Sequence, residues 1–181
     1  MTIVNIMSTL LALGVIVGQI GIGASLVYFL FFRKKQNAFS RFLTKHGLML
    51  AFVVALVCTC GSLFYSEIAG FTPCELCWFQ RIFMYPEVIL LGLAVWRKNT
   101  SIVDYVLSLS VVGGLISLYH NYIYYYNNGL NAHCLVAGQG VSCVKRYVFE
   151  FGYITIPMMA LTGFAIIIVC LVFVKMGSKR T

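Results

Sequence analysis

Five apolar runs, each long enough to cross a lipid bilayer as a helix, dominate this chain of 181 residues. A helix needs about 20 apolar residues to span a hydrocarbon core of about 30 Å. The mean hydropathy of +0.92 and a charged fraction of only 10% leave little sequence for a separate soluble domain. The sequence therefore predicts an all-α membrane protein, built as a compact transmembrane helical bundle. The predicted spans are 3–32, 47–65, 78–96, 103–123 and 154–174.

The thirteen lysines and arginines are divided unevenly between the two sides of this predicted bundle. Ten lie on one side, after the first, third and fifth spans, which by the positive-inside rule is the cytoplasmic side. The N-terminus is then expected outside the cytoplasm and the C-terminus inside it. The net charge of +8 is thus explained by topology, and no nucleic-acid partner is expected. The ten residues are Arg33, Lys34, Lys35, Arg41, Lys45, Arg97, Lys98, Lys175, Lys179 and Arg180.

The seven cysteines separate into two groups according to their predicted depth. Three lie within apolar runs, where a buried thiol usually behaves as a small apolar side chain. The other four lie in the two loops predicted outside the cytoplasm, which is the oxidising side, where disulfides persist. These four residues are Cys74, Cys77, Cys134 and Cys143.

The first outer loop ends in the segment TPCELC, which carries the pattern of a helix start. Thr72 is predicted as the N-cap, Pro73 as the first helical residue, and Glu75 as the partner of Thr72 in a capping box. Cys74 and Cys77 would then occupy the first helical turn. Unpaired backbone N–H groups and the helix dipole favour a thiolate at this position, so we expect reactive thiols.

Arg81 follows Cys77 by one helical turn, and the spacing predicts that Cys74, Cys77 and Arg81 share one face of the helix. Two interpretations of the arginine are open. Its side chain could extend to lipid headgroups, or it could bind an anion or a polar carbonyl group at the membrane boundary. A redox ligand with carbonyl oxygens would suit the second interpretation.

The second outer loop contains Cys134 and Cys143, separated by eight residues and several glycines. Such a pair can close a disulfide, either as a structural staple or as a redox partner for the first pair. A zinc site that uses these thiols with His133 is disfavoured, because the spacing exceeds that of ordinary zinc knuckles, and no metal is expected. A thioredoxin-like role for the CxxC pair is also disfavoured, because that fold needs a soluble βαβ context.

Several of these features together resemble the disulfide bond formation protein B family, and within it the BdbC branch of Gram-positive bacteria. The similarity covers about residues 46 to 175. It is carried by the element CxxCxxQR at 74–81, the second cysteine pair, His120 near the end of the fourth span, and the run FGYITIPMMALTGF at 151–164.

The resemblance implies a thiol:quinone oxidoreductase of the bacterial inner membrane. Such an enzyme reoxidises a thioredoxin-like dithiol oxidase and passes the electrons to ubiquinone or menaquinone. It implies that Cys77 is the thiol nearest the quinone and that Arg81 holds the quinone. It also implies that Cys134 forms the mixed disulfide with the partner, and that Cys143 completes this outer pair. His120 matches a histidine near the quinone, although it could equally be an interfacial histidine in the aromatic segment LYHNYIYYY.

The N-terminal segment departs from this family. The family core has four helices, so residues 1–45 are expected to form an additional transmembrane helix and a basic cytoplasmic linker, and residues 46–181 the oxidoreductase core.

Glu87, which follows Pro86 near the middle of the third span, is a costly residue at this depth. We expect it to be protonated or paired inside the bundle beside a kink at Pro86; proton supply to a quinone is the alternative.

Two other functions remain open. One is a vitamin K epoxide reductase-like enzyme, although its CxxC pair is expected on a later span. The other is a non-enzymatic membrane subunit with structural loop disulfides.

Overall fold

The computed structural model describes residues 2–31, 38–126 and 147–178, and nearly all of them are helical. Within these residues, five helices are long and apolar enough to cross a membrane. This confirms the prediction of an all-α membrane bundle with one helix beyond a core of four. The helices are α1 (Thr2–Phe31), α2 (Ala38–Leu63), α3 (Glu75–Arg97), α4 (Val103–Tyr126) and α5 (Ile156–Ser178), and a π-helical turn, η1 (Phe64–Ile68), continues α2.

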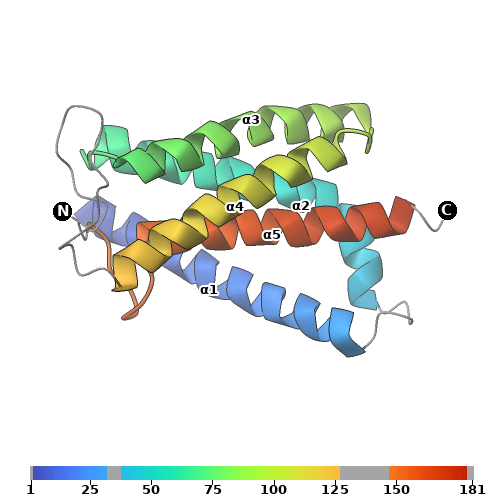
Figure 1. Ribbon diagram of the computed structural model, residues 1–181, viewed down its shortest axis with the longest axis horizontal. Helices are drawn as coiled ribbons and strands as arrows, with labels where there is room; N and C mark the ends of the chain where they lie inside the picture. The colour runs from blue at the N-terminus through green and yellow to red at the C-terminus, as the bar shows by residue number, and fades with distance from the viewer. Residues whose placement is uncertain (1, 32–37, 127–146, 179–181) are drawn as a thin grey trace.

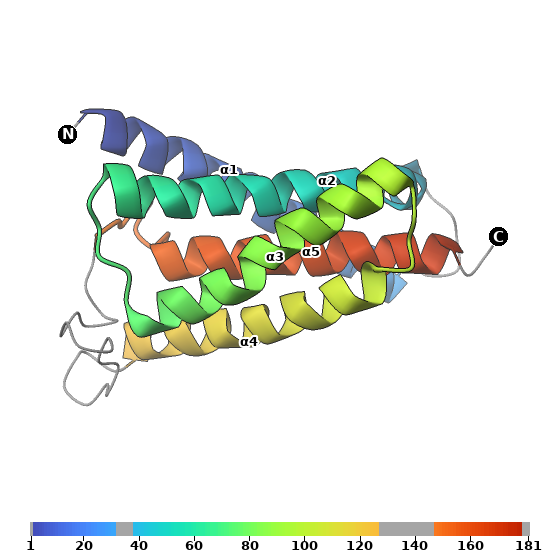
Figure 2. The ribbon, with the colours of Figure 1, turned by 90° about the horizontal axis from the view of Figure 1, so that it is seen from above.

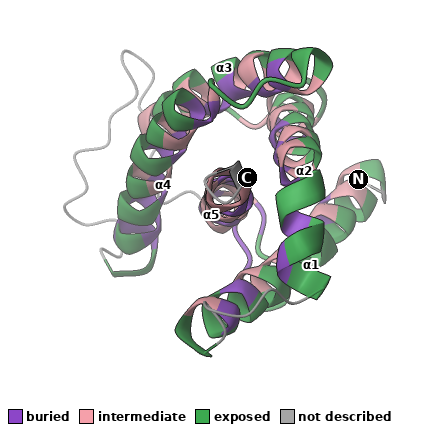
Figure 3. Ribbon diagram, turned by 90° about the vertical axis from the view of Figure 1, so that its right-hand side faces the viewer, coloured by how far each residue is buried: buried purple, intermediate pink, exposed green. Residues whose placement is uncertain are grey.

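Helix α5 lies in the middle of the bundle, with the other four helices around it (Figure 3). It packs closely against α2 and α4, and α1 packs against its remaining side. Helix α3 packs between α2 and α4. The central position fits the composition of α5, which is almost entirely apolar and contributes Phe164, Ile167 and Leu171 to the fully buried core.

Glycine allows α4 and α5 to approach closely at Gly113, where an added Cβ would overlap the ring of Phe164. We expect Gly113→Ala to lower the free energy of unfolding by about 1 to 3 kcal/mol, because a buried aromatic ring has no room to move aside. Gly114→Ala is the matched control, since its Cβ would lie at an ordinary 3.7 Å from Phe164. Thermal unfolding in detergent, followed by circular dichroism, measures both; equal stability of the two variants would contradict the packing described here.

The two ends of the bundle differ in character (Figures 1 and 2). The N-terminus and the starts of α3 and α5 lie at one end, and the C-terminus lies at the other. The described basic residues, apart from Arg81, gather at the C-terminal end: Arg41, Lys45, Arg97, Lys98 and Lys175.

Helix α2 begins at Ala38, earlier than the predicted start of the second span at residue 47, so Arg41 and Lys45 lie in its first turns. A helix can continue past the apolar core when its polar residues reach water, and hydropathy alone does not mark that start.

Candidate functional site

The cysteine pair lies where an extended segment enters α3. The helix begins two residues later than predicted, because its N-cap is Cys74 and not Thr72. Cys74 itself is the N-cap, with φ −77° and ψ 172°, and no side chain caps the helix. The first helical hydrogen bond runs from the Trp78 N–H to the Cys74 carbonyl, at 3.1 Å. The predicted capping box of Thr72 and Glu75 is therefore wrong, and Pro73 remains outside the helix.

Stacked rings account for this later start. The ring of Phe71 stacks on Tyr65, with centroids 5.7 Å apart, and on Tyr147, with centroids 4.6 Å apart. These contacts hold the segment before Cys74 against η1 and so keep it extended. Cys74, Cys77 and Arg81, which were predicted to share one helix face, line one cavity, although Cys74 precedes the first helical residue.

A buried chain of polar contacts connects α3 with α4 at this point. The Cys74 and Cys77 sulfurs lie 3.0 Å apart, and Cys74 Sγ lies 3.7 Å from His120 Nε2. The Gln80 amide nitrogen lies 3.1 Å from His120 Nδ1. Because an amide nitrogen only donates, Nδ1 accepts this bond and the ring proton lies on Nε2, facing the Cys74 sulfur. His120 is 1% exposed, so its ring faces the inside of the bundle.

These contacts favour the thiolate form of Cys74. The hydrogen bond with the Cys77 thiol is the main cause, and together with the contact to His120 it outweighs burial and lowers the pKa of Cys74 from 9.0 to about 4. Thiolate is the attacking species in thiol–disulfide exchange. Cys74 is therefore poised to react at neutral pH.

This lowered pKa predicts an unusual pH dependence of alkylation. In the reduced protein, we expect iodoacetamide to modify Cys74 nearly as fast at about pH 6 as at about pH 8, because the thiolate is lost only as the pH falls through the lowered pKa. The same cysteine in the unfolded protein should slow about tenfold per pH unit over this range. Mass spectrometry of the modified peptide measures both rates, and parallel pH profiles would contradict the assignment.

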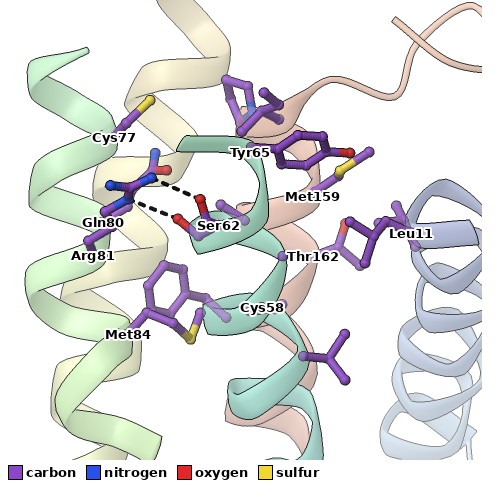
Figure 4. A pocket seen from close by; sticks show the side chains of 18 of the residues that line it. Leu11, Cys58, Ser62, Tyr65, Cys77, Gln80, Arg81, Met84, Met159 and Thr162 are labelled. Atoms are coloured by element: carbon purple, nitrogen blue, oxygen red, sulfur yellow. Dashed lines mark hydrogen bonds between the residues drawn. The ribbon is translucent and has the colours of Figure 1, made fainter. Parts of the chain in front are cut away.

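Arg81 is anchored to α2 rather than directed toward the lipid headgroups (Figure 4). Its Nε donates to Ser62 Oγ and its Nη2 to the Ser62 carbonyl, both at 2.9 Å. The guanidinium lies 5.2 Å from the centroid of the Trp78 ring and acts electrostatically on the Cys77 sulfur. Its Nη1 has no hydrogen bond to another described residue, so one donor of a fixed cation is free for a ligand.

A cavity of about 370 Å³ joins these groups. Its size lies within the range of about 300 to 1,000 Å³ of small-molecule sites. Cys77, Gln80, Arg81 and His120 give it a polar side, and the remaining walls from α1, α2 and α5 are mainly apolar. This donor set fits a quinone, because the free Nη1 can bind a ring carbonyl while apolar walls enclose the rest.

The second cysteine pair, Cys134 and Cys143, lies outside the described residues, as does His133. Within the described part of the chain, Cys74, Cys77 and His120 bring three donor atoms within 4.8 Å of one another. A structural zinc site uses four ligands. The arrangement therefore does not by itself indicate a metal.

Glu87 is fully buried and faces α4, as expected of a carboxyl group kept inside the bundle. Its Oε1 accepts a hydrogen bond of 3.0 Å from Ser110 Oγ, and its Oε2 has no partner among the described residues. Glu87 does not line the cavity that contains Cys77. It therefore has no direct contact with that site.

Known proteins are similar to this chain in sequence. The profile of the family described as disulfide bond formation protein DsbB matches residues 44–174. Disulfide bond formation protein C of Bacillus subtilis (strain 168) is 42% identical over 134 residues, which cover 73% of this chain and 94% of the relative. Probable disulfide formation protein C 1 of Bacillus anthracis is 44% identical over 126 residues, 70% of this chain and 89% of the relative. No solved structure matches the chain.

Proposed function

Because this chain belongs to the disulfide bond formation protein DsbB family, we propose that it is a thiol:quinone oxidoreductase that reoxidises an extracytoplasmic dithiol oxidase. It is a multi-pass membrane protein with an oxidoreductase role in disulfide bond formation. The observation that best supports the proposal is the single cavity in which Cys77 and Arg81 face apolar walls. That combination suits a ligand with a polar ring and an apolar tail, which membrane quinones have.

The outer half of the proposed reaction uses the second cysteine pair. A reduced thioredoxin-like partner attacks the Cys134–Cys143 disulfide, with Cys134 forming the mixed disulfide, and the partner leaves oxidised. The two thiols released on Cys134 and Cys143 then reduce a Cys74–Cys77 disulfide by a second exchange. Each exchange moves two electrons and leaves one disulfide in place of another.

The inner half restores the Cys74–Cys77 disulfide. As an S–S bond forms, the two thiols give up two electrons and two protons. When bound, the quinone supplies the acceptor for these electrons and protons. The Nε2–H of His120 stabilises the Cys74 thiolate, and Gln80 holds this histidine in position. Arg81, held by Ser62, would hold a ring carbonyl of the quinone through its Nη1, because a fixed cation in a dry site stabilises negative charge.

The proposed orientation of the protein in the membrane follows from the basic residues at one end of the bundle. With the basic end in the cytoplasm of a bacterial cell, the N-terminus and both cysteine loops lie outside it. Residues 1–45 form the additional N-terminal part, and residues 46–181 form the redox core. Ubiquinone and menaquinone both suit the donors present. Membership of the DsbB family favours this function over a vitamin K epoxide reductase-like enzyme.

Coupled turnover tests the proposal. We expect the purified protein in lipid vesicles to oxidise a reduced thioredoxin-like dithiol oxidase only when quinone is supplied, with one quinol formed per disulfide. Quinol formation is followed by its ultraviolet absorbance and the partner's thiols by alkylation. Removing the quinone should leave Cys74, Cys77, Cys134 and Cys143 reduced. If all four stay oxidised while the reduced partner accumulates, the protein is a structural subunit and not an electron carrier.

A further inference from the structure

Helix α1 lies outside the region that the family profile matches, yet it forms one wall of the redox cavity. Leu10, Leu11, Gly14 and Val15 of α1 line the same space as Cys77 and Arg81. Figure 4 shows Leu11 on the opposite side of this space from Arg81. The cavity is therefore not complete without α1.

Specific contacts hold α1 in this position. Near its start, the Tyr65 hydroxyl donates to Ser8 Oγ at 3.1 Å, in a buried contact. Farther along, the Tyr153 hydroxyl donates to Gln19 Oε1 at 2.8 Å, and Gln19 Nε2 donates to Thr162 Oγ1 at 3.4 Å. Polar bonds at two heights therefore fix α1 relative to η1 and to the first turns of α5 with the segment before it.

Apolar packing between these bonds strengthens the same interface. Ala12 and Val15 are buried and form a small cluster with Ile154, against which Met159 packs. Gly18 lies directly against Ile166 of α5, and a Cβ added there would come within 2.5 Å of the end of the Ile166 side chain. By contrast, a Cβ added at Gly14 would meet nothing within 4 Å, so the wall is open at the position that lines the cavity.

The polarity of the cavity changes from one side to the other. The side near α3 carries the Arg81 guanidinium and the Cys77 sulfur, whereas the α1 side carries only hydrocarbon and the bare Gly14 backbone. A ligand that fills both parts needs a compact polar ring and a flexible apolar chain. Continuity with the redox site favours a quinone tail here over the acyl chain of a phospholipid.

We propose that α1 completes a binding site for the polyprenyl tail of the quinone, which passes the open surface of Gly14 between α1 and the α2–α5 side of the cavity. This rests on the proposed function, because the ring of the same molecule lies at Arg81 and Cys77. It gives the additional N-terminal helix a role in selecting ligands by their tails.

A pair of glycine variants tests this site. Gly14→Leu places a side chain in the cavity, and Gly23→Leu makes the same exchange on the opposite side of α1, also with open space around its Cβ. For Gly14→Leu, we expect the dissociation constant of a long-tailed quinone to rise about tenfold, as when several buried methylenes lose their contacts. A tail-less benzoquinone or naphthoquinone should bind as it does to the unmodified protein. Gly23→Leu should change neither.

Equilibrium binding in detergent, followed by quenching of tryptophan fluorescence, measures these constants, and the KM for each quinone gives a second readout. If Gly14→Leu folds poorly, Leu11→Ala serves as the second variant, because it enlarges the cavity. It too should weaken the binding of the long-tailed quinone only. Unchanged binding of the long-tailed quinone, or equal weakening of both quinones, overturns the tail site. If the unmodified protein binds neither quinone, the proposed function itself fails.

Discussion

Replacing Cys77 by serine is expected to reduce quinone-dependent turnover by about a thousandfold or more, since the variant loses the sulfur that closes the Cys74–Cys77 disulfide. A hydroxyl cannot form that bond, so two electrons cannot leave the thiol pair together. Serine is close to cysteine in size, and Cys77 is only partly buried. The bundle should therefore fold normally, and the loss should lie in the chemistry.

The variant should also accumulate an intermediate. Without Cys77, a disulfide between Cys74 and a cysteine of the outer pair cannot be resolved forward into a Cys74–Cys77 disulfide, and the remaining outer thiol can only reverse the exchange. We therefore expect this linkage to accumulate on nonreducing gels and in peptide mass spectra. Cys60→Ser is the matched control, because Cys60 is an exposed thiol on α2 that does not line the cavity. If Cys77→Ser turns over at the wild-type rate, the role assigned to this thiol is wrong.

The spans could be predicted from the sequence because each requires a long apolar run, and a run of that length is rare for any other reason. Their ends were less predictable, since they depend on tertiary contacts. The start of α3 illustrates this. The TPCE pattern indicated a capping box, but stacking of Phe71 between Tyr65 and Tyr147 holds the chain extended as far as Cys74.

The candidate site was predictable along α3 and much less so across helices. Spacing alone placed Cys74, Cys77 and Arg81 on one face. The partners supplied by other helices had no local signature: nothing in the sequence around Ser62 indicates that it anchors Arg81, nor that His120 meets Gln80. The only signal for Gln80 was its place beside Arg81 in the CxxCxxQR element.

Arg81 provides the second large expected effect. Arg81→Met keeps much of the side-chain volume and removes the cation, and we expect the turnover with quinone to fall by about a hundredfold to a thousandfold, the scale for losing a preorganised charge donor. Arg81→Lys keeps the positive charge, so its turnover with quinone should fall less than that of Arg81→Met but should not reach the wild-type value. A lysine ammonium cannot both occupy the two Ser62 acceptors in the arginine geometry and present a free donor to a ligand.

The two half-reactions separate this effect from general damage to the protein. Arg81 lies on the quinone side of the thiols, so Arg81→Met should still exchange disulfides once with the reduced partner, at the normal rate, and then stop. Stopped-flow measurement of that first exchange, beside steady-state quinol formation, distinguishes the steps. Ser62→Ala removes one of the two anchors and keeps the charge, so it should raise the KM for quinone more than it lowers kcat. If the first exchange and quinone turnover fall together in Arg81→Met, Arg81 supports the fold of the thiol site and does not bind the electron acceptor.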